Sequence, residues 1–265
     1  MSDFKTTVKE SLLRLIFELM GTCLLTTLWL STNPYNVGGG GIGFFIGFFV
    51  LLVFSARISG SHFNPAVTLA FMVRTETGGF SRALGFAYIL FQLIGALLGG
   101  LLGYIFFMAR PPLFLVPTVN GGYLILQSMF LQIIAAAILV FLYLTQTEEK
   151  TKLSDDNAIT TLIIAASYFV SVFWSSEYTN VQTPSPVNPA IAIADSFAIW
   201  IEYNIPPWRF YIWMFWVFPL VGSLLAVLLF ECVFKRAQKI VADQKAQEDG
   251  SSVHESKDDM LLSND

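Results

Sequence analysis

The chain has 265 residues, of which 55% are hydrophobic and only 13% are charged. Soluble domains usually carry about 25% charged residues, so this chain has too few to cover a water-facing surface. Its 15 basic residues stand against 19 acidic ones, which excludes a nucleic-acid binder driven by net positive charge. The composition therefore predicts a protein that crosses a membrane several times.

Six stretches are long and apolar enough to cross a bilayer, which takes roughly 20 residues. They are Leu12–Leu30, Val37–Ile58, Leu84–Ala109, Tyr123–Leu144, Ala158–Trp174 and Trp208–Phe234. Residues 1–10 are polar and no small-residue cleavage site follows the first stretch, which predicts an uncleaved anchor rather than a secretory signal. We therefore expect an all-α membrane protein with six transmembrane helices.

Basic residues are distributed unevenly between the loops of this arrangement. If the N-terminus is cytoplasmic, all of the 15 Lys and Arg residues except Arg110 and Arg209 lie on the cytoplasmic side. The positive-inside rule then predicts that both termini are cytoplasmic. Residues 235–265 are polar and cannot bury much apolar surface, so we expect a disordered cytoplasmic tail.

Groups that carry enzymatic or metal chemistry are scarce. Cys23 and Cys232 both lie inside apolar stretches, and the chain has only two His residues. This pattern disfavours a disulfide framework and a metal site. Beyond Glu18, the spans lack a convergent set of acids, bases or nucleophiles. We therefore expect no enzyme activity and no cofactor.

An Asn-Pro-Ala tripeptide occurs twice, each time before an apolar stretch of about two to three turns, too short to cross a bilayer. Asn is a preferred helix N-cap and Pro is favoured at the first helical position. The pattern predicts two half-helices that begin at the second residue of each tripeptide. The residues of the two motifs are Asn64, Pro65, Ala66, Asn188, Pro189 and Ala190.

The order of these elements is span, span, half-span, span, and it occurs twice. An odd number of spans separates equivalent elements, so residues 11–110 and 122–234 run in opposite directions as an inverted repeat. The two half-helix N-termini would meet at the midplane, each with roughly half a positive charge. Their Asn amides would orient a water molecule and exclude protons and cations.

These residues resemble the major intrinsic protein family, the aquaporins and glycerol facilitators, over about residues 10–234. The matching segments are Glu18–Thr22, Ser59–Thr68, Gln92–Ala96 and Trp216–Gly222. The resemblance implies a right-handed bundle of six helices with two re-entrant half-helices. It also implies a homotetramer in membrane lipid, with one pore in each subunit.

The second motif departs from the family pattern, because Ile191 stands where the family normally has an Arg that lines the narrowest point. The loss of this Arg resembles the unorthodox, or superaquaporin, branch. By spacing, Phe44 and Ser185 fall on two further positions of the same constriction. The fourth position is left open between three residues, Phe169, Val170 and Ser176.

Three residues are candidates for supporting the re-entrant loops. The resemblance assigns this role to Glu18, and its equivalent in the second half is Gln132 instead of the usual Glu. Gln still accepts hydrogen bonds, but without charge. His62 precedes the first motif and is expected to be a hydrogen-bonding post, with a pH-sensitive gate as the alternative.

We therefore expect a passive channel for water and/or small neutral solutes such as glycerol, urea or hydrogen peroxide. Without the Arg, the pore either admits larger neutral solutes or has a hydrophobic constriction that excludes water. One alternative is a structural membrane protein that kept the fold and lost conduction. Another is a gradient-coupled transporter, for which no central acidic pair is present. The host membrane is expected to be the plasma membrane or an internal vacuolar membrane.

Overall fold

The computed structural model of the chain describes residues 2–32, 39–75, 80–107, 118–119, 122–178, 181–182, 185–206, 208–244 and 246–247. Its α-helices are α1 (Ser2–Thr32), α2 (Gly39–Ser59), α3 (Pro65–Val73), α4 (Arg82–Phe107), α5 (Ile125–Thr147), α6 (Asn157–Ser176), α7 (Pro189–Tyr203) and α8 (Met214–Leu229). A 3-10 turn, η1 (Arg209–Tyr211), precedes α8, and a π-helical turn, η2 (Phe230–Phe234), follows it.

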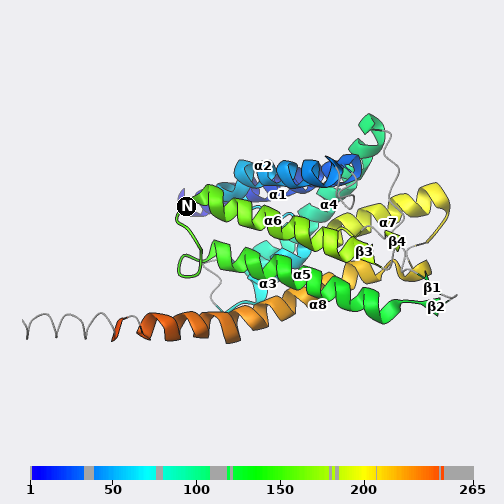
Figure 1. Cartoon of the computed structure of the whole chain (residues 1–265). Helices are drawn as coiled ribbons and strands as arrows, with labels where there is room; N and C mark the ends of the chain where they lie inside the picture. The colour runs from blue at the N-terminus through cyan, green and yellow to red at the C-terminus, as the bar shows by residue number, and fades with distance from the viewer. Residues whose placement is uncertain are drawn as a thin grey trace, which may run out of the picture.

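Two short antiparallel hairpins lie at one end of the helical bundle. Strand β1 (Thr118–Val119) pairs with β2 (Gly122–Tyr123), and β3 (Glu177–Tyr178) pairs with β4 (Val181–Gln182). We call this the hairpin end. The opposite end, where α1 begins and where the loop between α5 and α6 lies, is called the N-terminal end (Figure 1).

The long helices α1, α2, α4, α5, α6 and α8 are each long and apolar enough to cross a membrane. Each overlaps one of the six stretches predicted from sequence, and α1 and α6 contain theirs entirely. By contrast, α3 has 9 residues and α7 has 15. At 1.5 Å per residue, α7 is about 22 Å long, short of the roughly 30 Å hydrocarbon core. The predicted all-α membrane fold with two half-helices is confirmed.

The helix contacts repeat in the two halves of the chain. In the first half α1 packs against α2 and α4, and in the second α5 packs in the same way against α6 and α8. Each half-helix crosses to the other half, since α3 packs against α8 and α7 against α4. Figure 1 shows α3 toward the N-terminal end and α7 toward the hairpin end. These equivalent contacts are those of an inverted repeat.

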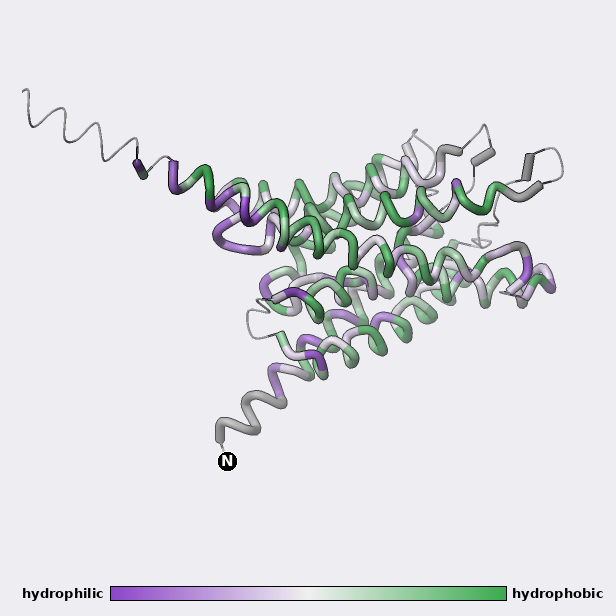
Figure 2. Tube along the Cα trace, turned by 90° about the horizontal axis from the view of Figure 1, so that it is seen from below, coloured by the Kyte–Doolittle hydropathy of each residue, from purple (hydrophilic) through white to green (hydrophobic). Residues whose placement is uncertain are grey.

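Apolar residues cover the outside of the bundle along the length of the helices, and most hydrophilic residues lie toward its ends (Figure 2). Large apolar side chains on the outer faces are more than half exposed, including Val53, Phe86, Leu101, Phe106 and Leu126. A water-soluble protein rarely exposes apolar patches of this extent. The outer surface is therefore suited to contact with lipid.

The end of the chain differs from the sequence-based expectation of a disordered tail at 235–265. Residues 235–244 are helical and continue the turn η2. No Gly or Pro occurs between Ser223 and Asp249, and Ala, Lys, Gln and Arg are good helix formers. Residues 248–265 lie outside the described part of the chain. At the other terminus α1 begins at Ser2, so residues 2–10 are helical as well.

Glycines allow equivalent helix pairs in the two halves to approach closely. A Cβ at Gly99 on α4 would collide with the backbone carbonyl oxygen of Cys23 on α1. On α8, a Cβ at Gly222 would collide with the carbonyl oxygen of Ile133 on α5. Small residues commonly serve this purpose in membrane helices, where backbone approach increases van der Waals contact.

Replacing Gly99 by Ala should therefore separate α1 from α4. Overpacking of this kind costs about 1–3 kcal/mol, and the apparent Tm in detergent should fall. The matched control is Gly100→Ala, because a Cβ there meets nothing within 4 Å. That variant should keep or raise the Tm. Equal Tm values for the two variants would contradict this account of the α1–α4 contact.

Candidate pore

The two Asn-Pro-Ala motifs start their half-helices in the same way. Asn64 is the N-cap of α3, and its Oδ1 accepts a 2.8 Å hydrogen bond from the Ala66 N–H. Asn188 caps α7, and its Oδ1 accepts a 3.0 Å bond from the Ala190 N–H. Both asparagines are buried. The capping role predicted for them is confirmed.

The asparagines also bind each other's loop. Asn64 Nδ2 donates to the Val187 carbonyl at 3.0 Å, and Asn188 Nδ2 donates to the Phe63 carbonyl at 2.8 Å. Phe63 and Val187 each precede an asparagine and have positive φ values of 47° and 49°. This left-handed conformation is unusual for a bulky or β-branched residue. It costs of order 1–3 kcal/mol, so the surrounding bonds must hold it in place.

This geometry uses one amide hydrogen of each asparagine. An asparagine NH2 group carries two donors, and one of them is bound to the carbonyl of the opposite loop. The second is not bound to the opposite loop, and on Asn188 the side chain also interacts with the Tyr168 hydroxyl. Both helix N-termini point toward the place where the two half-helices meet, and each contributes a partial positive charge there.

Glu18 on α1 binds the loop that leads to α3. Its Oε1 accepts from Ser59 Oγ at 2.7 Å and from the His62 N–H at 3.0 Å. Its Oε2 accepts from the Phe63 N–H and from Gln92 Nε2, both at 2.8 Å. The carboxylate is fully buried and has four donors. This geometry supports the loop-supporting role expected for Glu18.

The loop before α7 has weaker support. Gln132 Oε1 accepts one bond, from Ser185 Oγ at 2.7 Å, and the Ser185 N–H donates to Ser176 Oγ at 2.9 Å. Tyr168 on α6 adds a third contact, because its hydroxyl donates to the Pro186 carbonyl at 2.8 Å. Neutral groups therefore hold the second loop where a carboxylate holds the first.

The predicted constriction residues are brought together in part. Phe44 and Ile191 are fully buried in one apolar cluster. Ser185 is also fully buried, and its hydroxyl is bound to Gln132. Of the three candidates for the fourth position, Ser176 contacts Ser185.

The other two candidates lie elsewhere on α6. Val170 is 46% exposed on the outer surface. Phe169 is half-buried and packs against Phe45 and Phe173, with ring centroids 6.0 and 6.3 Å apart. These positions favour Ser176 over Phe169 and Val170 for the fourth position of the predicted constriction.

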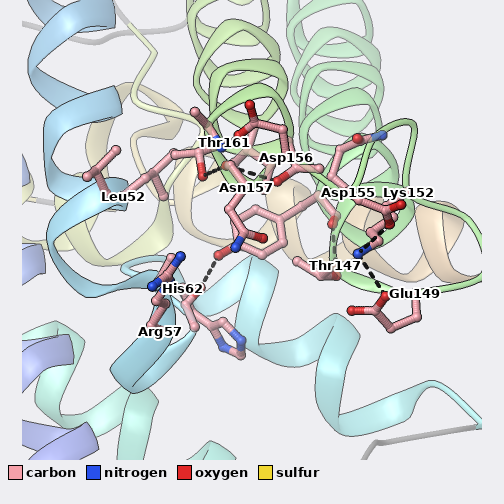
Figure 3. Close-up of a pocket in the computed structure, with 18 of the residues that line it drawn as sticks. Leu52, Arg57, His62, Thr147, Glu149, Lys152, Asp155, Asp156, Asn157 and Thr161 are labelled. Atoms are coloured by element: carbon pink, nitrogen blue, oxygen red, sulfur yellow. Dashed lines mark hydrogen bonds and ion pairs between the residues drawn. The ribbon is translucent and has the colours of Figure 1, made fainter.

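A cavity of about 880 Å³ opens at the N-terminal end (Figure 3). His62 and Arg57 lie on one side, and the loop between α5 and α6 lies on the other. In that loop Lys152 bridges Glu149 at 2.7 Å and Asp155 at 3.1 Å. Hydrogen bonds to these two carboxylates raise the pKa of Lys152 above its ordinary value. The cavity thus has walls with both charged and polar groups.

His62 is largely buried in the wall of this cavity. Its ring lies 4.4 Å from the Phe71 ring, and its Nδ1 is 3.2 Å from Thr68 Oγ1. Its backbone N–H binds Glu18. These contacts support the hydrogen-bonding post expected from the sequence, and they leave the ring at the cavity surface.

Sequence reasoning missed a buried acid on α7. Asp195 lies one turn beyond Ile191, and its Oδ2 accepts a 2.9 Å bond from Trp29 Nε1 at the end of α1. The Trp29 ring also contacts Phe44, with centroids 6.0 Å apart. A carboxylate inside an apolar half-helix was the available signal, because acids at membrane depth are usually paired or functional.

A cluster of ion pairs that the sequence did not indicate joins the end of α3 to the ends of α5 and α8. Arg74, which follows α3, binds Glu148 at 2.6 Å, and Lys235 binds Glu148 at 3.2 Å and Glu231 at 3.3 Å. These side chains are largely buried. The contacts between the ends of α3, α5 and α8 depend on the fold and have no local sequence signal.

The six spans form an inverted repeat, and the two half-helices meet at the asparagines that cap them. This arrangement defines a polytopic membrane protein with a site where the half-helices meet. A family model described as "Major intrinsic protein" matches residues 3–230. The chain belongs to the major intrinsic protein family. Fold and family together define an integral membrane channel for water or small solutes, and not an enzyme.

Individual relatives match over most of their length. Aquaporin-4 of Mus musculus is 28% identical over 269 residues, which covers 96% of this chain and 77% of that protein. Aquaporin PIP2-7 of Arabidopsis thaliana is 28% identical over 241 residues, with coverage of 88% and 82%. The solved aquaglyceroporin of Plasmodium falciparum matches with a TM-score of 0.66 at 20% identity, over 87% of this chain and 99% of that one. This last likeness shows the fold.

The unequal support of the two loops gives a stability prediction. Glu18→Ala leaves four buried donors without an acceptor, and each such loss costs about 1–3 kcal/mol. Gln132→Ala removes the acceptor of one donor. The apparent Tm in detergent should therefore fall much further for Glu18→Ala. Similar losses in the two variants would show that the first loop does not depend on Glu18.

Proposed function

We propose that the protein is a passive channel for water and small neutral solutes, driven by osmotic or concentration gradients. The observation that supports this most is the reciprocal pair of bonds from Asn64 and Asn188 to the opposite loops. These bonds place two donor groups beside two positive helix N-termini at one point. A neutral molecule with an accepting oxygen can be bound there, and no covalent chemistry is required.

Proton exclusion follows from the same arrangement as part of the proposal. A water molecule that accepts bonds from Asn64 and Asn188 directs its oxygen toward both asparagines. It then cannot accept a proton along the file of water, and cations meet the positive half-helix ends. Water would cross without a proton current.

The constriction toward the hairpin end is proposed to be less polar than in ordinary family members. Phe44 and Ile191 contribute apolar surface, and the Ser185 hydroxyl is occupied by Gln132. No Arg side chain adds donors at position 191. Neutral solutes such as glycerol, urea or hydrogen peroxide are therefore the proposed permeants besides water.

Orientation and assembly are part of the same proposal. Both termini are proposed to be cytoplasmic, because nearly all basic residues flank that side under the positive-inside rule. The cavity at the N-terminal end would then be the cytoplasmic mouth. A homotetramer in the plasma membrane or an internal vacuolar membrane is proposed from family membership.

One observation favours a second candidate, a structural membrane protein that does not conduct. Phe44, Ser185 and Ile191 are all fully buried, so none of them borders open space in this structure. A protein of this kind would assemble normally and give no flux. Flux measurements on reconstituted protein distinguish it from a channel.

The test is the reswelling of proteoliposomes in glycerol, followed by stopped-flow light scattering. An open neutral-solute pore should give fast shrinkage and then fast reswelling. Shrinkage without reswelling would restrict the permeant to water. Rates equal to those of protein-free liposomes, from correctly assembled protein, would favour the structural alternative.

Replacing Ile191 by Arg should make the pore more selective for water over larger neutral solutes. The new guanidinium adds bulk and positive charge to the apolar cluster that contains Phe44, so the ratio of glycerol to water permeability should fall. The control is Ile191→Leu, which keeps the volume and the apolar character and should leave the ratio unchanged. An unchanged ratio in Ile191→Arg would show that position 191 does not set solute selectivity.

A further inference from the structure

The cavity at the N-terminal end points along a path between α2 and α6. Leu52 on α2 and Ile164 on α6 both line it. Figure 3 shows Leu52 at its edge. Residues four positions apart lie on the same face of a helix. One turn further toward the hairpin end, the same faces therefore carry Phe48 on α2 and Tyr168 on α6.

Aromatic rings fill this next level. The rings of Phe48 and Tyr168 are 4.9 Å apart at 78°, and those of Phe44 and Tyr168 are 5.4 Å apart at 71°. Phe44 and Phe48 stack at 6.5 Å. All three side chains are at most 3% exposed. The cavity thus ends at a cluster of three rings in edge-to-face and stacked contact.

Tyr168 is the member of this cluster that is bound to the re-entrant loop. Its hydroxyl donates to the Pro186 carbonyl at 2.8 Å. Pro186 is followed by Val187, whose carbonyl accepts from Asn64. The ring is therefore tethered beside the two asparagines, by this hydrogen bond and by the interaction of its hydroxyl with the Asn188 side chain.

We propose that Tyr168 is the barrier of the pore: its ring, tethered to the Pro186 carbonyl and packed on Phe44 and Phe48, closes the path beside the paired asparagines. This inference rests on the proposed channel function and deepens it. Tyr168 determines the size of permeant that passes and the rate at which it passes. Phe44 and Ile191 lie further toward the hairpin end and act after it.

The barrier has two parts that variants can separate. Tyr168→Ala removes the ring and the tether, and Tyr168→Phe keeps the ring and removes only the tether. Phe169→Ala is the matched control, because it removes a ring of the same size from the neighbouring position. The Phe169 ring faces Phe45 and Phe173, away from the cluster.

The experiment measures water and glycerol permeability of proteoliposomes that contain the wild-type chain or each variant. Tyr168→Ala should raise glycerol permeability about 10-fold or more, because an aromatic constriction is replaced by a wide one. Tyr168→Phe should lie between Tyr168→Ala and wild type. Phe169→Ala should stay close to wild type. Equal apparent Tm values and equal oligomeric state would show that the variants are folded.

The outcomes separate this inference from the channel function. A conducting wild type with an unchanged Tyr168→Ala would overturn the barrier and leave the channel standing. A rise of equal size in Phe169→Ala would also overturn it, because a loosened bundle would then be the cause. A silent wild type with a conducting Tyr168→Ala would support both. Silence in wild type and Tyr168→Ala alike would overturn both.

Discussion

The structure depends on the reciprocal bonds between each asparagine and the carbonyl before the other one. Half-helices that stop at the midplane leave backbone groups exposed where lipid can satisfy none of them. Asn64 and Asn188 each bind an N–H of their own helix and a carbonyl of the opposite loop. The carbonyls point correctly because Phe63 and Val187 adopt the left-handed conformation. Each half of the repeat therefore completes the other, and the packing of α3 on α8 and of α7 on α4 joins the two halves.

The two halves share this frame but differ chemically. A buried carboxylate with four donors holds the first loop, whereas neutral groups, the Gln132 amide among them, hold the second. The N-terminal end has a cavity with charged walls, whereas the path toward the hairpin end is filled by aromatic and apolar side chains. The proposed selectivity and closure therefore depend on residues of both halves, Phe44 and Phe48 on α2 and Tyr168 on α6, and on Ile191, which replaces the positive charge usual in the family.

Much of the fold could be predicted because it depends on local patterns. Apolar length predicts the spans, and the N-cap preference of Asn with Pro at the first helical position predicts both half-helices. The site was less predictable, because its contacts join residues far apart in the chain. The binding of Ser185 to Gln132, of Asp195 to Trp29 and of Tyr168 to Pro186 depends on how helices pack. The polar composition of residues 235–265 predicts disorder, but residues 235–244 are helical because no residue there interrupts a helix.

The most direct test of the account is the simultaneous measurement of water and proton flux through the reconstituted wild-type protein. Stopped-flow light scattering reports osmotic water flux, and a pH-sensitive dye trapped in the same vesicles reports protons. The paired asparagines predict water flux above that of protein-free liposomes, with proton flux equal to theirs. Water flux at the level of protein-free liposomes, or a proton current that accompanies water, would contradict the account.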